Sequence, residues 1–196
     1  HSVFRFLIWR NGTSTIVSAA SKAAEACHHC LITHGLVGPV ALMPVHMQVQ
    51  VRRVTFDQAC LDRQARAILS DVGEASAELG ILFVGDQRMR SLNRQYRGKD
   101  RTTDVLAFAM REAPHSSSAV LGDVVIAVPT AVRQAKEGQR SLDEELTVLL
   151  VHGILHLCGY DHERSEKEAR RMQRRERMIL RSLGSLPVRV NRKGHE

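Results

Sequence analysis

The sequence predicts a small α+β domain, in which a mixed sheet of about four strands packs with about five helices. Two observations support this fold class. Short apolar or alternating segments of strand length are mixed along the chain with longer segments in which apolar residues recur at helical spacing. The 196 residues are enough for one domain, and 43% hydrophobic with 25% charged residues is a composition typical of globular proteins.

The expected strands are short and rich in Val, Ile, Leu and Phe, and they cover residues 45–51, 81–84, 105–108 and 121–128. The expected helices, counted from their first capping or opening residue, cover residues 55–71, 86–97, 129–138, 141–157 and 165–183. A polar segment at residues 114–118 separates the third and fourth strands. Strands mixed with helices along the chain indicate a small α/β or α+β domain.

Three of these helices begin with the form of a capping box, at Thr55–Gln58, Ser141–Glu144 and Ser165–Glu168. We expect Asp86 to cap the second helix, which closes before a glycine. Gly159 stands where the residue after the end of a helix belongs, so the chain is expected to reverse there. The last helix is expected to bury Met172, Ile179 and Leu183.

Composition changes along the chain predict three segments. Residues 1–44 lack a clear period and are expected to be a poorly ordered extension, either a leader or sequence upstream of a true start at Met43 or Met47. Residues 45–183 form the domain, and residues 184–196 form a basic tail. The expected location is the cytoplasm, or a mitochondrion or chloroplast if the extension is a transit peptide.

The spacing of the cysteines and the length of the apolar runs exclude some classes of protein. The four cysteines do not have the spacing of a disulfide framework, which favours a reducing compartment. Cys27 and Cys30 have the spacing of half a zinc knuckle, but no second pair completes it, so no structural zinc is expected there. No apolar run has the length that a membrane span needs, so no membrane partner is expected.

The positive charge of the chain is concentrated near its C-terminus. Residues 163–196 contain eleven Lys or Arg and five Asp or Glu, and so carry six of the seven formal positive charges. A polyanionic partner such as nucleic acid explains this surplus. A solvated helix face followed by a basic tail explains it equally well.

Three histidines within eleven residues predict a metal site. His152 and His156 are four residues apart on the expected helix, so both imidazoles project from one face. His162 follows the turn glycine, on the returning segment. Three histidines with an open fourth position are typical of a catalytic zinc site that activates water. Burying two imidazoles among leucines costs free energy unless they are ligated or hydrogen-bonded, which favours metal binding over simple packing.

The histidine spacing also matches the metzincin protease signature H-E-x-x-H-x-x-G-x-x-H, with one departure. Gly153 stands where that signature has glutamate, the general base for peptide hydrolysis. Because glycine has no side chain to accept the proton, the metal site is expected but the protease chemistry is not.

The same segment resembles the signature of the YbeY family. Residues 152–162 read HGILHLCGYDH and resemble the family's H-G-x-L-H-L-x-G-Y-D-H. Two further blocks agree in order and spacing, at residues 92–108 and 121–123, and the resemblance extends over residues 45–183. The chain departs from the family pattern at two positions, Thr102 (commonly proline) and Ala107 (usually serine).

The resemblance implies a single-strand-specific, metal-dependent endoribonuclease with one Zn²⁺ held by His152, His156 and His162. It further implies an essential arginine at Arg97 and a role in the maturation of small-subunit (16S) ribosomal RNA, including its 3′ end, and in ribosome quality control. The implied partners are single-stranded ribosomal RNA and ribosomal or small-subunit proteins.

Four other roles follow from the chemistry of single residues. Arg97 offers a planar fork for phosphate oxygens and Lys99 a nearby point charge, so both are candidate RNA contacts; without the resemblance, Arg97 would be interpreted as a surface ion pair. Asp123 and Asp161 are candidates either for the general base or for a partner that orients an imidazole.

Two alternatives to the nuclease remain at this stage. One is a metzincin-like metalloprotease, disfavoured by Gly153. The other is a non-catalytic ribosome-assembly factor that uses zinc to hold its fold, for which Cys158 would be the fourth ligand. Cys158 is only two residues from His156 and is therefore expected to point to a different face of the helix.

Overall fold

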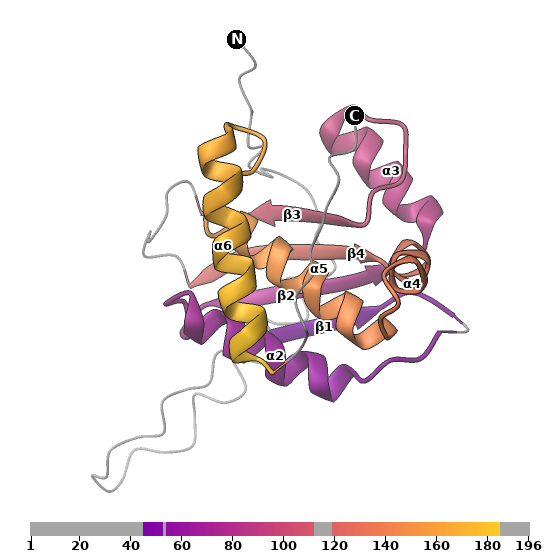
Figure 1. Ribbon diagram of the computed structural model, residues 1–196. Coiled ribbons are helices and arrows are strands. Elements are labelled where there is room, and N and C mark those ends of the chain that lie inside the picture. Colours follow the sequence, from indigo (N-terminus) through magenta and orange to yellow (C-terminus); the bar gives the residue numbers. More distant parts are fainter. Residues whose placement is uncertain (1–44, 53, 112–118, 185–196) are drawn as a thin grey trace, which may run out of the picture.

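The computed structural model describes residues 45–52, 54–111 and 119–184, in which a four-stranded mixed sheet is combined with five helices (Figure 1). The strands are β1 (Val45–Val49), β2 (Glu78–Val84), β3 (Val105–Ala109) and β4 (Val120–Ala127). The helices are α2 (Gln58–Asp71), α3 (Asp86–Arg97), α4 (Val128–Glu137), α5 (Leu142–Leu157) and α6 (Glu166–Ser182). The predicted α+β class is therefore confirmed. The predicted extension, the Cys27–Cys30 pair, the segment 114–118 and nearly all of the basic tail lie outside the described residues.

The sheet has the strand order β1-β2-β4-β3. Strands β1, β2 and β4 are parallel, and β3 is an antiparallel edge strand whose Leu106 pairs with Val125 of β4. Helices α2 and α5 pack on one face of the sheet, with α6 packed against α5, and α3 packs on the other face. On β4, Val124 and Ile126 belong to the first core, whereas Val125 and Ala127 belong to the second. From Asp123 onward, after the register shift at Leu121, the alternation along this strand therefore tells which side of the sheet each residue faces.

Helix α5 lies centrally, between the sheet and α6 (Figure 1). Its predicted capping box is confirmed, because the backbone N–H of Ser141 donates to Glu144 over 2.8 Å and the N–H of Glu144 donates to the Ser141 hydroxyl over 3.2 Å. Most residues of α5 are buried. At Gly153 the helix approaches β4 so closely that an added Cβ would lie 2.6 Å from Cγ1 of Val124. Glycine is therefore required at this position by packing.

Two predicted caps are wrong. Helix α2 is capped by Asp57, whose carboxylate accepts from the N–H of Cys60 over 2.8 Å, and Thr55 lies outside the helix. Aspartate ranks above threonine as an N-cap. Asp86 is the first residue of α3 and does not cap it; its carboxylate accepts from Thr130 and Arg133 of α4 instead. Asp86 therefore joins two helices.

The buried face of α6 contains more than the sequence predicts. Met172 and Ile179 are buried as expected, while Leu183 follows the end of the helix and is only partly buried. Leu180 and the carboxylate residue Glu176 are also buried. Within the part of the chain that is described, none of the helices combines the length and apolar character needed to cross a membrane.

Candidate metal centre

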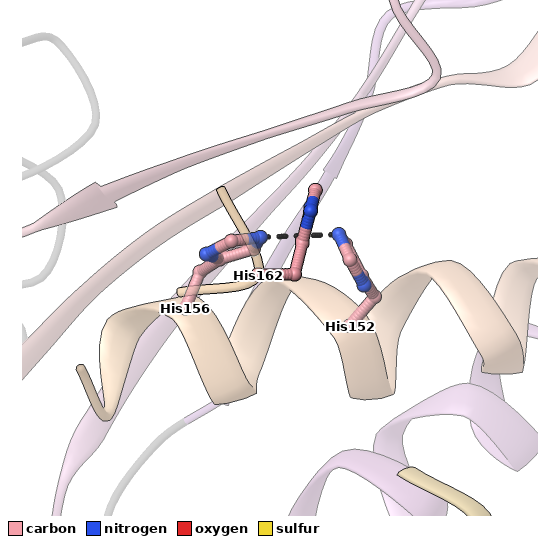
Figure 2. A group of neighbouring side chains, drawn as sticks. All are labelled: His152, His156 and His162. Carbon is pink, nitrogen blue, oxygen red and sulfur yellow. Dashed lines mark hydrogen bonds between the residues drawn. The ribbon is translucent and has the colours of Figure 1, made fainter. Parts of the chain in front are cut away.

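His152, His156 and His162 converge, the first two from α5 and the third from the segment after it (Figure 2). One ring nitrogen from each lies within 4.8 Å of the others, and Nε2 of His152 is 3.1 Å from Nε2 of His156. Two imidazole nitrogens bound to one tetrahedral zinc ion at about 2.0–2.1 Å lie about 3.3 Å apart. The donor set and its spacing therefore fit a single ion of this kind.

The end of α5 places the third histidine. The N–H of Tyr160 donates to the carbonyl of Leu155 and the N–H of Gly159 to the carbonyl of His156, both over 3.0 Å. Gly159 has a φ of +84°, which residues with a side chain rarely adopt. This turn folds the chain back, so that His162 faces the two histidines of the last helical turns.

Glu176 of α6 is a member of the site that the sequence analysis missed. Its carboxylate lies 2.6 Å from Nδ1 of His152, and the two residues are only 8% and 6% exposed. The contact holds the proton of His152 on Nδ1, which leaves the lone pair of Nε2 directed at the centre. A signal was present in the sequence, since residue 176 lies at helical spacing from Met172 and Ile179 on the buried face.

The environment keeps His156 neutral. Burial, together with the neighbouring His152 and His162, lowers the pKa of His156 to about 3, while the nearby Asp161 opposes the shift. Because a neutral imidazole is the form that binds a metal ion, the folded site presents this ligand ready for binding at neutral pH.

Asp161 and Asp123 lie in different environments. The Asp161 carboxylate accepts from the N–H of Glu163 over 2.9 Å and from Arg164 over 3.2 Å, so it holds the turn that carries His162. Asp123 is two residues before Val125 on β4, so the two side chains lie on the same side of the sheet. That side is opposite α5. Burial raises the pKa of Asp123 above its usual value. The structure therefore brings Asp161, but not Asp123, to the histidine side.

Arg97 lies beside the histidine site. It is the last residue of α3, and its Nη2 donates to both carboxylate oxygens of Glu163 over 3.2 Å. Glu163 directly follows His162 in the sequence. Arg97 is about a third exposed, at 35%, so its guanidinium remains open to a ligand. Lys99 follows two residues later with an exposed side chain.

Cys158 is not part of the group of potential metal ligands, which in the described ranges consists of the three histidines. Burial raises the pKa of its thiol to about 11. The absence of Cys158 from the ligand group agrees with the expectation that it points to a different face of the helix from His156. A closed site with four protein ligands therefore has no support from Cys158.

Comparisons with known proteins agree on a family. The profile of the family "Endoribonuclease YbeY" matches residues 46–184. The protein of that name from Anaeromyxobacter sp. (strain Fw109-5) is 51% identical over 124 residues, which is 63% of this chain and 64% of the relative. The one from Geobacter metallireducens is 45% identical over 141 residues, 70% of this chain and 94% of the relative.

A solved structure shares the fold. The solution structure of TM1509 from Thermotoga maritima matches with a TM-score of 0.50 and 23% identity, covering 77% of this chain and 100% of the other. The family match extends over the whole described domain and includes the three histidines, Arg97 and Glu176. With this fold, these converging histidines and relatives of this similarity, the chain belongs to the endoribonuclease YbeY family.

Proposed function

We propose that this chain is a single-strand-specific, metal-dependent endoribonuclease that acts in the maturation of small-subunit (16S) ribosomal RNA, including its 3′ end, and in ribosome quality control. The observation that carries the proposal is the convergence of three imidazoles beside Arg97 in a member of this family. The proposed partners are single-stranded ribosomal RNA and proteins of the small subunit, in a bacterial-type cytoplasm.

Zinc is the proposed metal. Three neutral imidazoles that leave a fourth position open are the usual ligand set of catalytic zinc, and His152, His156 and His162 would hold it. When bound, such an ion lowers the pKa of a water ligand or polarises a phosphoryl oxygen. Glu176 fixes the tautomer of His152, and Asp161 fixes the turn before Glu163.

Arg97 and Lys99 are the proposed phosphate contacts. The Arg97 guanidinium is held at the site by Glu163, a carboxylate that, like a phosphate, offers two anionic acceptor oxygens. RNA binding would exchange that carboxylate for two phosphate oxygens, and the positive charge would stabilise the more negative transition state. Lys99 would add a point charge from the loop that follows α3.

The two rival functions are less well supported. A metzincin-like protease needs a glutamate at position 153, where even a methyl group would collide with Val124 of β4. A zinc protein without catalytic activity would be expected to close its site with a fourth protein ligand, and Cys158 is not positioned to do so. A site with an open position is the arrangement used for catalysis.

Purified protein should be incubated with single-stranded RNA, double-stranded RNA and casein, each with and without a chelator. We expect cleavage of single-stranded RNA that stops when the metal is removed and is absent in His156→Ala, with casein intact. Cleavage of casein would establish the protease instead. Stoichiometric metal with no cleavage of any RNA would favour the assembly factor, and RNA loss that persists in His156→Ala would indicate a contaminating nuclease.

A further inference from the structure

Helix α6 carries a continuous row of positive charge. Six exposed basic residues, here called the α6 basic stripe, are Lys167, Arg170, Arg171, Arg174, Arg177 and Arg181. At 3.6 residues per turn these positions fall within an arc of about 120°, and at 1.5 Å per residue they extend over about 21 Å. The three acidic residues of the helix lie outside the arc. The stripe is therefore unbroken by negative charge.

The stripe faces away from the body of the protein. The buried residues Met172, Glu176 and Ile179 point toward the core and lie on the opposite side of the helix from the stripe. Figure 1 shows α6 as an outer helix that lies in front of α5. A ligand can therefore reach the whole length of the stripe from solvent.

Most of this charge is not neutralised within the described part of the chain. Arg170 pairs with the exposed Glu166 and Arg171 with the partly exposed Glu168, and ion pairs this accessible to solvent are weak. Lys167, Arg174 and Arg181 form no ion pair with any described residue. Like charges spaced three and four residues apart destabilise a helix, so the stripe weakens α6 instead of strengthening it.

The stripe begins at the metal centre. Helix α6 starts four residues after His162, and the guanidinium of Arg171 lies 4.9 Å from the centre of the Tyr160 ring, in the segment between α5 and His162. Met178, the one large hydrophobic side chain that is exposed in the described residues, is 53% exposed and lies inside the same arc. The surface thus joins a row of cations to an apolar contact and leads away from the three histidines.

We propose that the α6 basic stripe is a docking surface for single-stranded RNA, which holds the strand on one side of the metal centre. This inference rests on the proposed function. A cationic track with a few apolar contacts is how proteins bind single strands without reading much sequence. RNA is favoured over an acidic protein because the stripe is continuous with the proposed cleavage site. The domain has few aromatic residues for base stacking, so phosphate contacts would supply most of the affinity.

The test removes charge far from the metal centre. One variant combines Arg174→Gln, Arg177→Gln and Arg181→Gln; its matched control combines Arg52→Gln, Arg63→Gln and Lys136→Gln, three exposed cations elsewhere on the domain. Binding of a labelled long single-stranded RNA is measured by fluorescence anisotropy at several salt concentrations, in chelator so that the RNA stays intact. Cleavage is measured with metal on the long RNA and on one of about four nucleotides, which is too short to reach from the metal centre to the end of the stripe.

We expect the stripe variant to bind the long RNA more than about tenfold more weakly at low salt, while the control stays near the parent. The slope of log affinity against log salt should become shallower by about 2, because each phosphate contact on a single strand contributes about 0.7. Cleavage of the short RNA should be unchanged. A second variant with Lys at the same three positions should recover most of the binding.

The proposal would be overturned if the stripe variant and the control bound the long RNA equally, whether both kept the affinity of the parent or both lost the same amount. A Lys variant as weak as the Gln variant would also overturn it, since the charge would then not be the cause. Failure of the proposed function gives a different result, in which the parent cleaves neither RNA. The binding measurement in chelator does not depend on that outcome.

Discussion

The carboxylate of Glu176 lies 2.6 Å from Nδ1 of His152, and this buried contact connects α6 to the metal centre. A metal-binding histidine commonly donates its second ring N–H to a carboxylate, which fixes the tautomer and makes the other nitrogen a better ligand. In this protein the same contact also anchors the helix that carries the basic stripe. The same pair of residues therefore orients the ligand and contributes, with the apolar residues of α6, to the position of that helix.

Glu176→Ala is expected to weaken metal binding by about 10-fold to 100-fold, because His152 loses the acceptor that orients it. Glu176→Gln keeps an acceptor oxygen without the charge, so it should recover part of the affinity. The measurement is a competition titration of zinc against a chromophoric chelator, together with the melting temperature of the metal-free protein.

Glu166→Gln is the matched control, since it removes the same charge from the same helix at a side chain that is 87% exposed. It should bind metal like the parent. Parent-like metal affinity in both Glu176 variants would show that this carboxylate has a structural role only.

The sequence predicts the parts of this site that depend on local spacing. His152 and His156 lie on one helical turn, and Gly159 sits at a positive φ, so the three histidines and their turn follow from a short segment. Contacts between segments that are distant in the sequence cannot be predicted in this way. The bond from Arg97 to Glu163 joins residues 66 apart, and no periodicity in either segment implies it.

Glu176 and Asp123 show why tertiary packing limits such predictions. Glu176 is one acidic residue in a basic helix, and only the packing of α6 on α5 makes it a partner of His152. Asp123 lies within the apolar strand β4, and its face is fixed only when β4 takes its place between β2 and β3. Sequence chemistry alone proposed both Asp123 and Asp161 as partners of the site, although the sheet separates one of them from the histidines.

Gly153→Ala is expected to destabilise the protein. The new methyl group would lie 2.6 Å from Cγ1 of Val124, and overpacking of this kind typically costs about 1–3 kcal/mol. The better helix propensity of alanine offsets about 1 kcal/mol of this cost. Urea unfolding should therefore show a net loss of as much as about 2 kcal/mol.

A double-mutant cycle tests the cause. Val124→Ala removes the two methyl groups nearest to the new Cβ and leaves Cγ2 of Val105 at 3.3 Å, so the double variant Gly153→Ala with Val124→Ala should be more stable than the sum of the two single losses predicts. If the two losses of stability are strictly additive, the cost of Gly153→Ala does not arise from its contact with Val124.

Asp123→Asn is expected to raise stability at neutral pH. Burial raises the pKa of Asp123 in the folded protein above its value of about 3.9 in an unfolded chain. The folded state therefore binds this proton more tightly than the unfolded state, and the favourable contribution is present below pH 3.9 and lost as the pH rises through the folded-state pKa. Asparagine stays neutral throughout. The gain of the variant over the parent should grow from pH 4 to pH 7 in denaturant unfolding, and a gain independent of pH would contradict the assignment.

Arg97→Ala is expected to retain stoichiometric zinc and near-normal folding while losing about 10²-fold or more in the single-turnover rate of RNA cleavage, because it removes a charge that would contact the transition state. Arg97→Lys should recover only part of the rate, since an ammonium lacks the bidentate fork. Bound zinc per chain is measured beside the rate for each variant. Loss of zinc in Arg97→Ala would mean that Arg97 supports the metal site, and cleavage at the parent rate would remove it from the chemistry.

Glu163→Ala separates the two ways in which Arg97 can act. If Arg97 only holds the turn of His162 through Glu163, removing either partner breaks the same contact, and the two variants should lose the same amount of activity. If the guanidinium contacts RNA, Glu163→Ala frees it for phosphate, so that variant should keep turnover and bind single-stranded RNA at least as tightly as the parent. We expect the second result. Equal losses in the two variants, with less than additive loss in the double variant, would establish Arg97 as a residue that positions His162.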